Sequence, residues 1–112
     1  EIAPALLEAD VVVSSMPVYW YSIPAQSKAV IDKMYSFCVA GKDIAGKECM
    51  LIACCEGDDQ SVLDGVRIPI ERTAALVKWH MAGEVLVPGV LNVGDIEKTD
   101  GCRQASALAE KL

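Results

Sequence analysis

Three adjacent aromatic residues, Tyr19, Trp20 and Tyr21, are the part of this chain whose residue types and spacing most suggest chemistry. They make up half of all Phe, Trp and Tyr side chains in the 112 residues, and they stand between Pro17 and Pro24. Aromatic faces on a loop suit a flat, ring-shaped ligand. Packing against neighbouring helices or a second copy of the chain would explain them equally well at this point.

The segments on either side show what must position these aromatics. Before them lies a β-branched run, Val11 to Val13, which is apolar at consecutive positions, as in a parallel strand covered on both faces. After them, Pro24 suits the first turn of a helix that ends near residues 40–41. The aromatics therefore lie on a loop between a buried strand and a helix.

The same strand-then-helix order occurs three times, following what looks like the end of a helix at residues 2–9. We expect strands at 10–15, 48–55 and 83–87, helices at 24–40, 69–80 and 99–112, and a short turn at 61–66, with Pro69 at a kink or break before the helix that follows this turn. This alternation predicts a three-layer α/β/α fold with a parallel sheet and right-handed crossovers. Ligands bind such sheets beyond the carboxyl ends of the strands, here the loops 16–23, 55–60 and 88–95.

Helical periodicity and composition predict which side chains are buried. The predicted buried stripes are Val30, Ile31, Met34, Tyr35 and Cys38 in one helix and Cys102, Ala105, Leu108, Ala109 and Leu112 in the last. Lys28 and Asp32 have the spacing of an ion pair on the outer helix face. Cys38, Cys49 and Cys54 lie in apolar stretches, and we expect buried free thiols in a reducing cytoplasm.

Composition and charge bear on other classes of function. The net charge is −6, and there is no cluster of Lys and Arg, so we set nucleic-acid binding aside. No apolar run approaches the roughly 18 residues of a membrane span, so we expect no membrane association. Five scattered cysteines and one histidine do not form a pattern of metal ligands. His80, beside Trp79, is expected to be a capping or surface group, and we predict no catalytic side chain.

The segment MPVYWYSIPAQSKAVID, residues 16–32, resembles the flavin-contacting segment of flavodoxin-fold, NAD(P)H-dependent FMN reductases. The matching positions are Pro17, Tyr19, Pro24, Lys28, Ile31 and Asp32. The resemblance implies a doubly wound sheet of strand order 2-1-3-4-5, FMN as cofactor, NADH or NADPH as substrate, and a homodimer or higher homo-oligomer. It also implies hydride transfer from NAD(P)H to FMN and on to an acceptor, which could be free flavin, a quinone, a metal ion or an aromatic compound.

The resemblance also predicts which residues contact the flavin. In the first loop they are Met16, Pro17, Val18, Tyr19, Trp20 and Tyr21, and in the second loop Gly57, where glycine allows a close backbone approach. The second loop, Glu56 to Asp59, could equally be a solvated turn with a helix cap. Its acidity is unfavourable for binding the anionic NADPH.

In that family a Ser/Thr-rich loop after the first strand holds the FMN phosphate, and no segment here corresponds to it. Residues 2–15 match the end of the family's second helix and its third strand. The resemblance therefore implies one flavodoxin-like domain over residues 1–112 that is incomplete at the N-terminus and has about three strands. We expect weak or no FMN binding by this chain alone, and self-association or strand exchange through the exposed edge at Val11–Val13.

Two other functions are compatible with the same residues. A flavodoxin-like electron carrier would bind FMN without oxidising NAD(P)H. A fragment whose role is subunit association would form a stable oligomer without any flavin.

Overall fold

A computed structural model describes all residues, 1–112. The sheet consists of β1 (Val11–Pro17), β2 (Glu48–Cys54) and β3 (His80–Val87). The helices are α1 (Ile2–Glu8), α2 (Ala25–Lys33), α3 (Tyr35–Val39), α4 (Asp64–Val77) and α5 (Gly101–Ala109), with short 3₁₀ helices η1 (Gln60–Leu63) and η2 (Asp95–Lys98).

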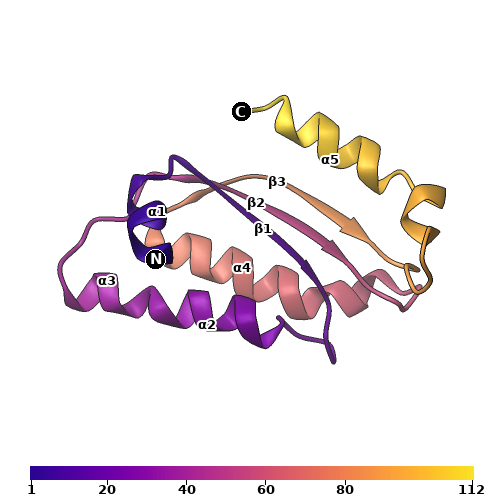
Figure 1. The fold of residues 1–112 in the computed structure, drawn as a ribbon, viewed down its shortest axis with the longest axis horizontal. Coiled ribbons are helices and arrows are strands. Elements are labelled where there is room, and N and C mark those ends of the chain that lie inside the picture. Colours follow the sequence, from indigo (N-terminus) through magenta and orange to yellow (C-terminus); the bar gives the residue numbers. More distant parts are fainter.

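The three strands are parallel and lie in the order β1-β2-β3, which confirms the predicted parallel sheet. All three arrowheads in Figure 1 point to the same end of the molecule, so the loops that follow the strands share one edge. The central strand β2 pairs on both sides, from Val11 opposite Glu48 to Val87 opposite Cys54. Its apolar residues are buried at consecutive positions because both faces of the sheet are covered.

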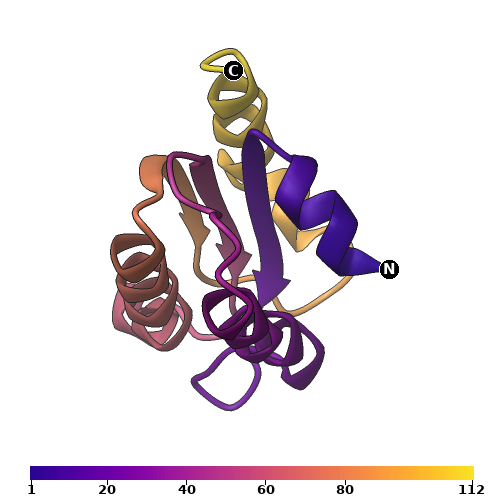
Figure 2. The same ribbon diagram turned by 90° about the vertical axis from the view of Figure 1, so that its left-hand side faces the viewer.

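Helices cover the two faces of the sheet, as a three-layer α/β/α fold requires. In Figures 1 and 2, α2, α3 and α4 lie on one side of the sheet and α5 on the other. The buried cluster toward α4 contains Met16, Ile23, Leu51, Ala53, Cys55, Leu63, Val66 and Ile70. The cluster toward α5 contains Met50, Val85, Val87 and Leu108. None of the helices is long and apolar enough to cross a bilayer.

Pro69 does not break the chain where the sequence pattern places a break. It lies inside α4, which runs without interruption from Asp64 to Val77. A proline lacks the N–H that would bond to the carbonyl four residues earlier, which is that of Gly65. The helix continues because Val66, Ile70 and Ala74, four residues apart, form a buried stripe that holds it against the sheet.

The boundary between α4 and β3 also differs from the predicted one. α4 ends at Val77 and β3 begins at His80, because Lys78 takes a left-handed conformation with φ of 61°. The Trp79 Nε1–H donates to the Ile44 carbonyl, which holds Trp79 against a third buried cluster. With these contacts, which are absent from the sequence pattern, the helix ends before residues 79–80 and His80 begins β3.

Several predicted core positions are wrong. On α3, Phe37 is buried, whereas Tyr35 and Cys38 are exposed, because the chain re-enters a new helix at Tyr35 and the face changes. On α5, Leu108 is buried, whereas Cys102, Ala109 and Leu112 are exposed, since the covered stripe of the helix runs through Gly101, Ala105 and Leu108. Among the cysteines, Cys49 is buried and Cys54 half-buried; all five are free thiols. The predicted Lys28–Asp32 ion pair is present, at 2.6 Å.

Candidate functional site

The three loops at the carboxyl edge of the sheet are joined by backbone hydrogen bonds. The Val18 N–H donates to the Cys54 carbonyl at 2.9 Å, which ties the first loop to the end of β2. The Gly89 N–H donates to the Gly57 carbonyl at 2.9 Å, which ties the third loop to the second. These bonds make one continuous surface out of segments that are far apart in the sequence.

The aromatic loop is a tight two-residue hairpin turn. Tyr19 and Ser22 exchange backbone hydrogen bonds of 3.1 and 3.0 Å, and the two residues between them, Trp20 and Tyr21, have φ of 53° and 64°. Positive φ at both central positions is the mark of a type I′ turn, which normally carries Asn and Gly. For a side chain with a Cβ, the left-handed region costs about 1–2 kcal/mol per residue.

This strained turn is held in place from both ends: before it, the Val18 N–H is bonded to the Cys54 carbonyl. Ile23, directly after it, is buried in the cluster with Leu63 and Val66, and the following Pro24 is buried as well. The aromatic rings themselves are free: the Trp20 residue is 96% exposed and Tyr21 is 72% exposed. Strained backbone conformations persist only where the surrounding structure holds them, and they cluster at functional sites.

A cavity of about 320 Å³ lies beside the turn. Its lining residues are Val18, Trp20, Tyr21, Cys55, Glu56, Gly57 and Val62. This volume is at the small end of the range, roughly 300–1,000 Å³, that ligand pockets occupy. The cavity therefore suits a compact group rather than a large ligand.

The cavity brings together part of the set predicted from the sequence. Val18, Trp20, Tyr21 and Gly57 line it. The three other residues of that set, Met16, Pro17 and Tyr19, do not: Met16 is 7% exposed and packs in the core, whereas Pro17 and Tyr19 are exposed at the edge of the loop.

Three lining residues, Cys55, Glu56 and Val62, were not named as flavin contacts from the sequence, although the predicted second loop contains the first two. Cys55 and Glu56 directly follow the second strand, and this position at its carboxyl end could have identified them as lining residues. Val62 lies in η1, and no pattern in the sequence places it at the cavity.

The thiol at the base of the cavity is held in its neutral form. The Cys55 Sγ donates to the Gly57 carbonyl at 3.3 Å, and the residue is buried. Burial raises the pKa of the Cys55 thiol, and the neighbouring Cys54 raises it further. A neutral thiol is a poor nucleophile, so this cysteine offers packing and a weak donor rather than covalent chemistry.

Some of the lining residues also offer backbone donors. The N–H groups of Trp20, Tyr21, Glu56 and Gly57 donate to no backbone carbonyl of the chain. Free N–H groups beside an apolar cavity suit the carbonyl oxygens or ring nitrogens of a heteroaromatic ligand.

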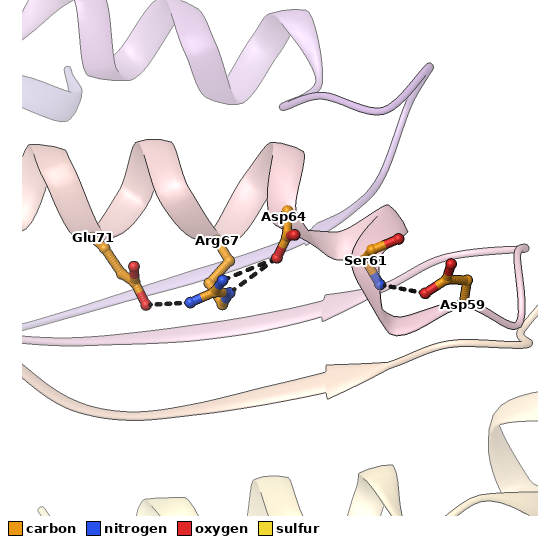
Figure 3. A network of polar contacts seen from close by, with 5 residues as sticks. All are labelled: Asp59, Ser61, Asp64, Arg67 and Glu71. Carbon is orange, nitrogen blue, oxygen red and sulfur yellow. Dashed lines mark hydrogen bonds and ion pairs between the residues drawn. The ribbon is translucent and has the colours of Figure 1, made fainter.

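The second loop leads into a polar network that fixes the start of α4, shown in Figure 3. The Ser61 N–H donates to the Asp59 carboxylate at 2.9 Å, and this hydrogen bond is the main reason that the pKa of Asp59 is lowered. The Arg67 guanidinium donates to the Asp64 carboxylate at 3.0 Å and to the Glu71 carboxylate at 3.1 Å. These contacts raise the pKa of Arg67, and the hydrogen bond to Asp64 is the largest cause. Both partners lie on α4 itself, so the guanidinium is occupied by its own helix.

Two other places in the molecule suit a ligand less well. A cavity of about 230 Å³ under the sheet is lined mainly by apolar side chains such as Val12, Ile31 and Ile70. His80 lies at the opposite, amino-terminal edge of the sheet, where its exposed Nδ1 is 2.7 Å from Glu48. It is a surface residue, and it lies at the wrong end of β3 to act at the aromatic turn.

A parallel sheet with helices on both faces and a cavity beyond its carboxyl edge defines a doubly wound α/β protein. A family model described as "Flavodoxin-like fold" matches residues 2–105, and the chain belongs to that family. A search of curated proteins gives no match.

Solved structures support the same fold. An NADPH-quinone reductase from P. pentosaceus superposes with a TM-score of 0.66 at 20% identity, over 96% of this chain and 68% of the other. The Trp repressor binding protein from Bacillus subtilis gives 0.67 at 20% identity, over 98% and 66%. A protein described as a quinone reductase, from Klebsiella pneumoniae, gives 0.60 at 23% identity, over 96% and 50%. This chain thus spans half to about two thirds of the length of each.

Proposed function

We propose that this chain carries the ring-binding half of a flavin site and belongs to a flavin-dependent NAD(P)H oxidoreductase of the flavin or quinone reductase type. The observation that carries the proposal is the strained Trp20–Tyr21 turn, which presents two exposed aromatic rings beside a small cavity at the carboxyl edge of the sheet. Two of the structural relatives are named as quinone reductases, which agrees with this type of reaction.

The residues present fit the isoalloxazine ring system. Trp20 and Tyr21 would supply aromatic faces, and Val18 and Val62 would supply apolar walls. The free N–H of Gly57 would donate to the ring's carbonyl oxygens or nitrogens. When bound, the flavin would supply the redox chemistry, accepting a hydride from NAD(P)H and passing electrons to an acceptor.

The chain's own part in such a reaction is positional. The cavity walls would exclude water from one side of the ring, and the turn would fix its orientation. Cys55 stays protonated because burial raises its pKa, and His80 lies at the far edge of the sheet. We therefore assign no side chain as a catalytic acid or base.

The same loops do not fit the phosphate of FMN. The second loop carries Glu56, Asp58 and Asp59, and the Lys98 ammonium near the third loop is bonded to Asp95 at 2.9 Å. Acidic side chains repel a phosphate dianion, so we expect FMN to gain nothing from its phosphate here. Riboflavin, which has the ring and lacks the phosphate, should bind at least as well as FMN.

Flavin fluorescence and NAD(P)H absorbance test the proposal together. We expect saturable quenching when the chain is titrated into riboflavin, and oxidation of NADH or NADPH by a form of the protein that holds its flavin. Bound flavin without any oxidation of NAD(P)H would favour an electron carrier. A stable oligomer without any quenching would favour the association role and contradict the proposal.

A further inference from the structure

Gly65, the second residue of α4, lies directly under the aromatic turn. A Cβ placed on it would come within 1.6 Å of the Tyr21 carbonyl oxygen and 2.6 Å of the carbonyl carbon. It would also lie 3.3 Å from the Ser22 nitrogen. These neighbours are backbone atoms, so no change of side-chain rotamer can make room, and any residue other than glycine must move the turn or the helix.

The local sequence gives no other reason for glycine at this position. The φ of Gly65 is negative, a conformation open to any residue, unlike Gly41, Gly46, Gly89 and Gly94. Glycine is also among the poorest helix formers, and α4 carries a proline four residues later. A helix with packing as its only requirement would gain from alanine here, so the close approach of Tyr21 is what calls for glycine.

The contact completes a clamp around the turn. On one side the Val18 N–H bonds to the Cys54 carbonyl, and on the other the Tyr21 carbonyl sits on Gly65. We infer that Gly65 is a positioning residue for ring binding: by admitting the Tyr21 carbonyl, it fixes where the Trp20 and Tyr21 rings stand over the cavity. This inference rests on the proposed function for its ligand, but the contact itself can be tested in the free protein.

The test is the Gly65→Ala variant. Helix propensity predicts that this substitution is favourable, whereas the clamp predicts that it disturbs the turn. Propensity alone would make the variant more stable. We expect instead that amide hydrogen exchange at Tyr19 and Ser22, the two bonded amides of the turn, becomes at least ten-fold faster while exchange at Leu51 in β2 is unchanged. Riboflavin affinity should fall at least ten-fold although both aromatic rings remain.

Two further variants make the result specific. Gly65→Ser should match Gly65→Ala, because the first side-chain carbon makes the clash. Gly46→Ala is the control: its φ is 78°, so it should cost stability, but its added Cβ meets nothing within 4 Å and lies away from the turn. We expect Gly46→Ala to leave both turn exchange and riboflavin affinity at wild-type values.

The outcomes separate the clamp from the function. Unchanged turn exchange and unchanged riboflavin affinity in Gly65→Ala would overturn the inference. Faster turn exchange in a protein whose wild type binds no riboflavin would support the clamp and refute the ring site. If Gly65→Ala does not fold, Tyr21→Gly is added, since a flexible turn can move off the helix: recovery of folding in the double variant supports the clamp, and failure to recover overturns it.

Discussion

Trp20 is the residue where local stability and the proposed function conflict most sharply. Its side chain is almost fully exposed, so it contributes little packing, and its backbone is left-handed, which costs free energy for an aromatic residue. Asparagine tolerates this conformation better because its short polar side chain can bond locally. An exposed and strained tryptophan is thus best explained by something that it contacts.

We predict that Trp20→Asn stabilises the chain by about 1 kcal/mol, because the strain of the turn is relieved. The same substitution should weaken riboflavin binding at least ten-fold, because the largest ring face is lost. Urea unfolding measures the first effect and flavin fluorescence the second. Tyr35→Asn, at an exposed aromatic on α3, is the matched control and should leave riboflavin binding unchanged. A Trp20→Asn variant with full affinity would show that this ring does not contact the ligand.

The reactivity of the Cys55 thiol can also be predicted at the scale of single residues. Burial raises its pKa above the ordinary thiol value, so less thiolate is present near neutral pH than at an exposed cysteine. We expect iodoacetamide to modify exposed Cys38 and Cys102 first, with Cys55 reacting only as the pH rises past the usual thiol range. Peptide mass mapping over a pH series gives the order. Early modification of Cys55 at pH 7 would contradict a neutral, buried thiol.

At the scale of elements, the start of α4 determines the shape of the site. Its first residues contain both a glycine and a proline, four positions apart, which is unfavourable for a helix on propensity alone. Gly65 is explained by the turn above it, whereas Pro69 lies about one helical turn further along α4. The two residues should therefore respond differently to substitution.

We expect Pro69→Ala to raise the free energy of unfolding by about 1–2 kcal/mol. The new N–H can bond to the Gly65 carbonyl, and part of that gain is offset by a more flexible unfolded chain. Riboflavin affinity should stay at the wild-type value because the turn still rests on Gly65. Arg72→Ala, on the exposed face of the same helix, controls for general helix effects. A less stable Pro69→Ala variant would mean that packing of the proline ring contributes more free energy than the missing hydrogen bond costs.

The sequence was a good guide to elements that are defined by burial. The run from Glu48 to Cys54 is apolar at every interior position, and such runs predict strands covered on both faces. The parallel sheet and the site at its carboxyl edge follow from the order of these elements. Long-range contacts could not be predicted from the sequence pattern. Trp79 donates to the Ile44 carbonyl, and Lys47 donates to the carbonyls of Leu7 and Ala9 at the end of α1.

The candidate site was predictable in part for the same reason. The spacing of prolines and aromatics marks the first loop, but nothing in it indicates that Trp20 and Tyr21 occupy the central positions of a type I′ turn, since Asn and Gly are the usual signal. The role of Gly65 depends on a contact between residues 44 positions apart, which no local pattern encodes.

At the scale of the whole molecule, the two edges of the sheet differ. The β3 edge carries the charged Glu84, and charge discourages pairing with another strand. The β1 edge consists of Val11 to Val13 followed by two serines, and Val13 is 47% exposed. An uncharged, partly apolar edge strand is prone to pair with another chain.

Self-association through β1 therefore remains a prediction. We expect light scattering to show an average mass that rises with protein concentration, and Val13→Lys to lower it toward the mass of one chain. Val39→Lys, at an exposed valine on α3, adds the same charge elsewhere and should have no effect. A monomer at all concentrations, or equal effects of the two lysines, would refute association at this edge.

The most direct test of the central claim is a paired titration of the wild-type chain into riboflavin and into FMN, following flavin fluorescence. Aromatic rings beside an acidic loop should bind the isoalloxazine ring and gain nothing from the phosphate. We predict saturable quenching of riboflavin, weakened at least ten-fold by Trp20→Asn, and an FMN dissociation constant no lower than that of riboflavin. Absence of quenching with riboflavin, or FMN binding tenfold tighter than riboflavin, would contradict a site that holds the ring alone.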